Sequence, residues 1–184
     1  MADQDPRSLV VFGFEDQMAA TEMLTALTRM STEGTLLLQD AVFVSKNEKG
    51  KVHVTETTDA SPGQAAMGGA FWGLLFGIIL FIPVIGMAIG AGTAALMAKL
   101  IDTGISDDFI KTLREKIEPG KVYLAVLVSH VNKEKALEEM KRYAGMAELI
   151  STTLPADSIE RMKDALDQHD VVHGVSEDES VIAE

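Results

Sequence analysis

The sequence contains no cysteine, and its basic residues are far fewer than its acidic ones. Without cysteine the chain cannot form disulfides, thiolate metal sites, iron–sulfur clusters or a thiol nucleophile. Its 16 Lys+Arg against 28 Asp+Glu give a net charge of −12. This charge repels a polyphosphate backbone, so we expect no nucleic-acid partner. At 184 residues the chain has room for one domain, or for one domain with an insertion.

Charge is also missing from one long window of the chain. Between Asp59 and Lys99 there is no Asp, Glu, Lys, Arg or His. Pro83 divides this window into two apolar segments, 65–82 and 84–101, because proline interrupts a helix. As helices of about 18 residues they would each be roughly 27 Å long, close to the ~30 Å thickness of the hydrocarbon core. The window therefore predicts a membrane-inserted helical hairpin that turns at Pro83.

Small residues recur every four positions on both apolar segments. They are Gly69, Gly73 and Gly77 on the first segment, and Gly86, Gly90 and Ala94 on the second. In a membrane such glycine-zipper faces let helix backbones approach closely. They can join the two arms of one hairpin, or the hairpins of different subunits. Trp72, on the first segment, is a candidate anchor at the membrane interface, with packing against lipid as the alternative.

The chain before the apolar window predicts the order β-α-β-β. Leu9–Phe14 is a short apolar run typical of a buried strand. A helix follows, with Asp16 near its N-cap and Gly34 after its end. Leu36–Ser45 and Lys51–Glu56 predict two strands joined by a polar turn.

The chain after the window predicts further helices and strands, each with its own signal. They are a helix between Ser106 and Pro119, a strand over Val122–Val128, a helix capped by Asn132, an edge strand over Ala147–Thr153, and a helix over Pro155–Leu166.

This order of elements predicts an α+β fold. We expect a ferredoxin-like sandwich in which the connection between the third strand and the second helix is enlarged by the hairpin. We assign residues 1–59 to the first part of this domain and 60–103 to the hydrophobic hairpin. Residues 104–168 form its second part, and 169–184 form an acidic disordered tail.

Several stretches together identify a family. They are Gln39–Val44 (QDAVFV), Gly68–Gly77 (GGAFWGLLFG), Gly104–Leu113 (GISDDFIKTL), Pro119–Val128 and Leu137–Met140. In their order and spacing the chain resembles a bacterial family known as domain of unknown function twelve-sixty-nine, small stress-associated membrane proteins. The resemblance covers Ser8–Leu166. It implies kinship and no particular activity, because the biochemistry of that family is unassigned.

No residue pattern indicates catalysis. His169 and His173 have the spacing of a helical metal pair, but no helix is predicted there. Asp107 and Asp108 are explained by the dipole of the helix that they begin. The chain has no glycine-rich phosphate loop that ends in Lys-Ser/Thr, and no nucleophile elbow. We therefore expect no enzyme activity, no cofactor and no metal.

The leading expectation is a non-enzymatic integral membrane protein, anchored by its hairpin and self-associating. It would be an envelope or stress-related scaffold, with the lipid bilayer and further copies of the chain as partners. Two crossings place both termini on one side, here the cytoplasmic side of a bacterial inner membrane. Two alternatives stay open: a small-molecule-binding or regulatory module, and a water-soluble homo-oligomeric particle that buries the hairpins inside.

Overall fold

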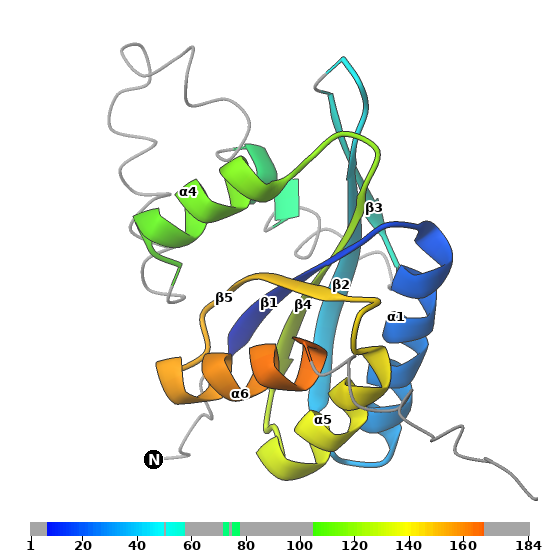
Figure 1. Cartoon of the computed structure of the whole chain (residues 1–184), viewed down its shortest axis with the longest axis vertical. Coiled ribbons are helices and arrows are strands. Elements are labelled where there is room, and N and C mark those ends of the chain that lie inside the picture. The colour runs from blue at the N-terminus through cyan, green and yellow to red at the C-terminus, as the bar shows by residue number, and fades with distance from the viewer. Residues whose placement is uncertain (1–6, 50, 58–71, 74, 78–104, 168–184) are drawn as a thin grey trace, which may run out of the picture.

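A five-stranded antiparallel sheet with helices on its faces forms the protein (Figure 1). The computed structural model describes residues 7–49, 51–57, 72–73, 75–77 and 105–167. The elements are β1 (Ser8–Phe14), α1 (Gln17–Thr32), β2 (Leu37–Lys46), β3 (Val52–Glu56), α4 (Asp107–Lys116), β4 (Val122–Ser129), α5 (Lys133–Met140), the 3-10 turn η1 (Lys141–Tyr143), β5 (Glu148–Thr152) and α6 (Ala156–Asp167). The predicted α+β class is confirmed.

The helices begin where their capping residues predict. The side chains of Asp16, Ser106 and Asn132 each accept a hydrogen bond from the main-chain N–H three residues on, at 2.9, 3.1 and 3.2 Å. These bonds satisfy donors that a helix N-terminus leaves without an internal partner. After α1 the chain turns at Gly34, whose φ of 70° suits glycine. These boundaries are set locally, so the sequence predicts them well.

The order of the strands, β3-β2-β4-β1-β5, corrects one part of the predicted fold. β4 lies at the centre and separates the two strands that flank α1: Val126 pairs with Val10 of β1 and with Ala41 of β2. β3 pairs with β2 at the outer edge. The prediction counted this strand as the third strand of the sandwich, but the structure places it at the edge of the described sheet, beside β2 alone.

Composition gives the physical reason for this order. β4 is apolar at nearly every position, as expected of a strand that is covered on both faces and lies between two others. β3 has the sequence VHVTE and exposes His53 and Thr55. A strand with polar, exposed alternate positions belongs at an edge.

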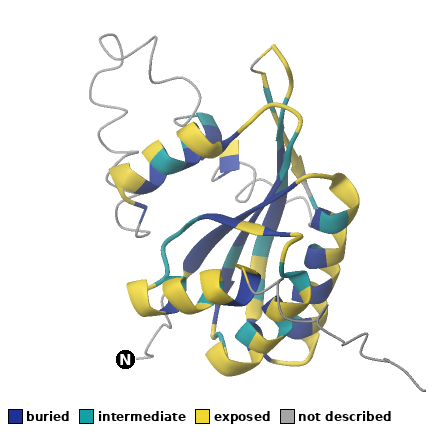
Figure 2. Ribbon diagram, viewed as in Figure 1, coloured by how far each residue is buried: buried dark blue, intermediate teal, exposed yellow. Residues whose placement is uncertain are grey.

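Both faces of the sheet are covered. Along β1, Val10 and Phe12 join one buried cluster while Leu9 and Val11 join the other, and all seven residues of the strand are buried. The first cluster lies under α1, α5 and α6, and the second lies under α4 and includes Trp72, Leu75 and Phe76. Figure 2 shows the buried strands in the middle and helices that are exposed on their outer sides.

Candidate functional site

The start of the apolar window lies on the sheet. Residues 72–73 and 75–77, here called the insert root, are helical. Trp72 and Phe76 are each 1 % exposed and Leu75 is 0 % exposed. The rings of Trp72 and Phe76 stack, with their centroids 6.2 Å apart. Large aromatic side chains contribute much of the apolar area buried in a core, so the insert root is a docked part of the domain.

The insert root is hydrogen-bonded to the sheet at a β-bulge. The register between β2 and β4 shifts between Leu38 and Asp40, where β2 carries one extra residue. A bulge of this kind re-aims the neighbouring side chains. The carboxylate of Asp40 accepts a hydrogen bond from Nε1 of Trp72 at 2.8 Å, and another from the main-chain N–H of Ala41 at 2.8 Å. We call the pair Trp72 and Asp40 the indole latch.

The chain that follows the apolar window is fixed to the same face through α4. Phe109, Ile110 and Leu113 of α4 belong to the buried cluster that holds the insert root. At the far end of α4, the Tyr123 hydroxyl donates to the main-chain carbonyl of Lys116 at 2.8 Å.

The same hydroxyl also closes the turn after α4. It accepts a hydrogen bond from the main-chain N–H of Glu118 at 2.7 Å. Burial is the main cause that raises the pKa of Tyr123, so the hydroxyl keeps the proton that it donates to Lys116. The chain is therefore attached to this face of the sheet at the insert root and again at α4.

The predicted small-residue face is described only in part. Among the residues that the structure describes, an ideal Cβ placed on Gly73 or on Gly77 meets no heavy atom within 4 Å beyond its chain neighbours and its own helix backbone. Gly73 is exposed, whereas Trp72 beside it is buried. The insert root therefore has two unlike sides: a large apolar side docked on the sheet, and a glycine side that is open. The remaining predicted positions, Gly69, Pro83, Gly86, Gly90 and Ala94, lie outside the described residues.

The prediction of a hairpin-anchored integral membrane scaffold is contradicted. Among the residues that the structure describes, no helix has both the length and the apolar composition needed to cross a membrane. Trp72, predicted as an anchor at the membrane interface, is instead buried in the domain and bonded to Asp40. The apolar side chains of the insert root are buried within the protein. The predicted location at a bacterial inner membrane rested on this hairpin.

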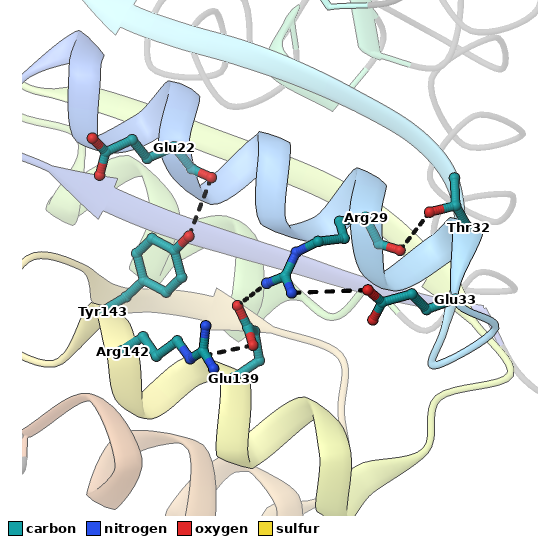
Figure 3. Close-up of polar contacts among 7 residues, drawn as sticks. All are labelled: Glu22, Arg29, Thr32, Glu33, Glu139, Arg142 and Tyr143. Carbon is teal, nitrogen blue, oxygen red and sulfur yellow. Dashed lines mark hydrogen bonds and ion pairs between the residues drawn. The ribbon is translucent and has the colours of Figure 1, made fainter.

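A cluster of charges ties α1 to α5 on the other face of the sheet (Figure 3). Arg29 of α1 pairs with Glu139 of α5, and it also lies 3.8 Å from Glu33. Glu139 in turn lies 3.5 Å from Arg142. The Tyr143 hydroxyl donates to a main-chain carbonyl of α1 at 3.2 Å, and burial is the main cause that raises its pKa. Sequence spacing gives the pairs within each helix, but not the pair that joins the two helices.

A cavity of about 320 Å³ lies at the end of α4, against the start of β4 and of β5. Its lysines are already paired: Lys121 lies 3.0 Å from Glu15 and 3.3 Å from Glu118, and Lys116 lies 3.1 Å from Glu148. The hydrogen bonds that Lys121 donates to the carboxylates of Glu15 and Glu118 raise its pKa. Because each cation has a partner within the chain, these side chains are explained as structural ion pairs.

In the described ranges no group of three or more His, Asp or Glu could hold a metal ion. His169 and His173 lie outside those ranges. Asp107 and Asp108 are exposed in the first turn of α4, the place that the helix dipole favours for acids. The part-buried polar contacts of the second face serve the indole latch and the end of α4.

A mixed α+β domain carrying an apolar insert that is docked on its own sheet is the class of protein defined by these observations. The family model described as "Protein of unknown function (DUF1269)" matches residues 66–167, more than half of the chain. The chain belongs to this family, as its resemblance in sequence predicts. No curated protein and no solved structure matches it.

Proposed function

We propose that this protein is a non-enzymatic module that associates with further copies of itself through the open side of its insert. The observation that carries the proposal is the contrast within the insert root. Trp72 and Phe76 are buried on the sheet, while an ideal Cβ on Gly73 or Gly77 has no neighbour within 4 Å in the described part of the chain. A helix that is anchored on one side and open on the other can offer its open side to a partner.

We infer that the domain carrying this insert has a ferredoxin-like core. Its four strands are β1, β2, β4 and β5, and its two helices are α1 and α5. Two features support this: the chain order is β-α-β-β-α-β, and β4 lies between the two strands joined by α1. In this arrangement β3, the apolar window and α4 together form one insertion between the second and third strands.

A second copy of the chain is the partner that the charge distribution favours. The net charge of −12 makes most surfaces of two copies repel each other. The window between Asp59 and Lys99 has no ionisable side chain, so a contact there brings no like charges together. Glycine at the contact lets two helix backbones approach closely, as the four-residue spacing from Gly69 to Gly77 suggests. The proposal assigns no catalytic residue, no cofactor and no nucleic-acid partner.

The mass in solution of the Gly73→Leu variant tests the proposal. Because the space beside Gly73 is open, the leucine fits without disturbing the domain, but it would keep a second helix from close approach. We expect the full-length wild type to be oligomeric by light scattering, and the variant to shift toward monomer. Thr21→Leu, on the exposed side of α1, adds a similar side chain elsewhere and should leave the mass unchanged.

Circular dichroism of each variant checks that the fold is retained. A wild type that stays monomeric over the accessible concentration range would refute self-association. An equal mass for wild type and Gly73→Leu would show that the glycine side is not the contact.

A further inference from the structure

A cavity of about 330 Å³ lies between the second half of α1 and the bulged part of β2. This volume falls at the lower end of the range of small-molecule sites. Leu24 and Leu38 provide apolar walls, and the polar ones come from Thr28, Ser31, Thr32, Gln39, Asp40 and Thr57. Ser31 accepts a hydrogen bond from the main-chain N–H of Leu38, and the side-chain amide of Gln39 donates to Ser129. The cavity is separate from the open glycine side of the insert, and it shares only Asp40 with the indole latch.

The threonine hydroxyls in this cavity have no proton left to offer a ligand. Thr28, Thr32 and Thr57 each donate to a main-chain carbonyl oxygen, at 2.9, 2.7 and 2.8 Å. A hydroxyl has one proton and two lone pairs, so each of these oxygens can still accept. Three polar positions of the wall are therefore hydrogen-bond acceptors.

Asp40 adds a negative charge to these acceptors. Its two oxygens already accept from Trp72 and from the main chain of Ala41, but a carboxylate has about four acceptor positions. No lysine or arginine is among the described residues that line the cavity. Arg29, which lies next to Thr28 in α1, is paired with Glu139 and Glu33 instead. The charge of Asp40 thus has no basic partner within the cavity.

We propose that this cavity binds a small aliphatic amine in its ammonium form. An ammonium group has three donors and no acceptor, which matches the three threonine oxygens and the Asp40 carboxylate in the lining. Its methylene groups would contact Leu24 and Leu38, and the charge of −12 attracts cations toward the molecule. A divalent metal ion fits less well, because such ions take several oxygen ligands and usually more than one carboxylate. The inference does not depend on self-association.

Trp72 gives a direct readout, because it is the only tryptophan and its indole donates to the carboxylate that the amine would bind. The full-length protein is titrated with n-butylamine at neutral pH and constant ionic strength, and followed by Trp72 fluorescence and calorimetry. n-Butanol, which has the same chain and no charge, is the matched ligand. We expect saturable binding of the amine, at least about tenfold tighter than the alcohol, because hydrogen bonds to charged groups are the stronger ones.

Variants separate the cavity from the acidic surface as a whole. Asp40→Asn should weaken amine binding at least about tenfold, since it removes the charge. Asn at this position also gives up one acceptor used by Trp72 or Ala41, so Thr28→Val is the independent test. It removes one acceptor from the wall and should weaken binding about threefold or more. Thr25→Val is the control: like Thr28, Thr25 donates its hydroxyl to a main-chain carbonyl of α1, but it does not line the cavity. This variant should bind n-butylamine as the wild type does.

The proposal is overturned if no saturable signal occurs with n-butylamine, or if n-butanol binds equally well. Equal weakening by Thr28→Val and Thr25→Val would also overturn it, because the amine would then be held by the general charge of the surface. Failure of the Gly73→Leu experiment would leave these results unaffected, so the two proposals fail separately.

Discussion

The two faces of the sheet are covered by different kinds of chain. On the first face, α1, α5 and α6 follow their strands through short connections, and an exposed charge cluster around Arg29 and Glu139 joins α1 to α5. On the second face, α4 and the insert root lie between β3 and β4 in the chain, and their polar contacts include those of Trp72 with Asp40, of Tyr123 with the end of α4 and of Lys116 with Glu148. We expect the loss of an exposed ion pair on either face to cost little, and the loss of the part-buried bonds of Trp72 and Tyr123 to cost more.

The largest expected effect tests whether the second face is as firmly packed as the first. Leu113 of α4 and Met23 of α1 are both 0 % exposed. Truncating either to alanine leaves a cavity, so we expect Leu113→Ala and Met23→Ala each to lower the free energy of unfolding by about 2–5 kcal/mol. Urea denaturation measures both. Met18→Ala, on the exposed side of α1, should change the free energy of unfolding by less than about 0.5 kcal/mol. If Leu113→Ala resembled Met18→Ala, α4 would not be a true part of the core.

The next effect tests the bond that closes the end of α4. Tyr123→Phe keeps the buried ring but removes the hydroxyl that serves both Lys116 and Glu118. Leaving buried polar groups without a partner costs about 1–3 kcal/mol each, so we expect the free energy of unfolding to fall by an amount of this order. Tyr143→Phe loses a single hydrogen bond on the first face, and this bond is exposed. We expect it to lower the free energy of unfolding by less than Tyr123→Phe does.

Tyr123 also predicts a dependence on pH. Its pKa is raised in the folded protein, so the folded state favours the protonated hydroxyl. The stabilising contribution is fully present below the ordinary tyrosine pKa of about 10, and it is lost as the pH rises through the raised value. We expect the stability difference between wild type and Tyr123→Phe to shrink above about pH 10. A difference that grew with pH would contradict this sign.

A smaller effect tests the indole latch. Trp72→Phe keeps an aromatic ring but removes the N–H that donates to Asp40. A hydrogen bond to a charged group contributes about 1.5–3 kcal/mol when buried, and Asp40 is only half-buried, so we expect a loss of about 1–2 kcal/mol by circular dichroism during urea denaturation. The neighbouring aromatic variant Phe76→Leu keeps the latch and separates the bond from the packing. An unchanged stability in Trp72→Phe would mean that the latch only orients the ring.

The smallest effect sharpens the contrast between the faces. Arg29→Gln and Glu139→Gln, alone and together, measure the coupling between α1 and α5 in a double-mutant cycle. The Arg29 side chain is 46 % exposed, so we expect a coupling of less than about 1 kcal/mol, lower again in 1 M salt. A coupling as large as the loss in Tyr123→Phe would place the stronger polar contact on the first face.

Local signals predicted much of the fold. The caps Asp16, Ser106 and Asn132 act within one turn of their own helices, so the sequence around them contains all the information that positions them. The pairing order of the strands, in contrast, is not set by local signals. The short turn between β2 and β3 reveals that they form a hairpin, but the place of β4 between β1 and β2 depends on a return of the chain after the insertion.

The candidate site was harder to predict than the fold. The side chain of Trp72 lies in a window without charge, and an apolar pattern has the same appearance whether lipid or a protein core covers it. Only the bulge at Asp40, which turns a carboxylate toward the indole, decides between these environments for the insert root. Neither residue has a local sequence signal for the other.

The sequence by itself determined the class of the fold, the limits of most helices and strands, and the apolar character of the window, because these follow from spacing and capping within a few residues. The tertiary structure alone decided that β4 is central, that the insert root lies on the sheet, and that three threonines and Asp40 line one cavity. Those features are contacts between segments far apart in the chain, and their energies depend on which surfaces meet. Local patterns specify which surfaces are apolar, but not which surface covers which.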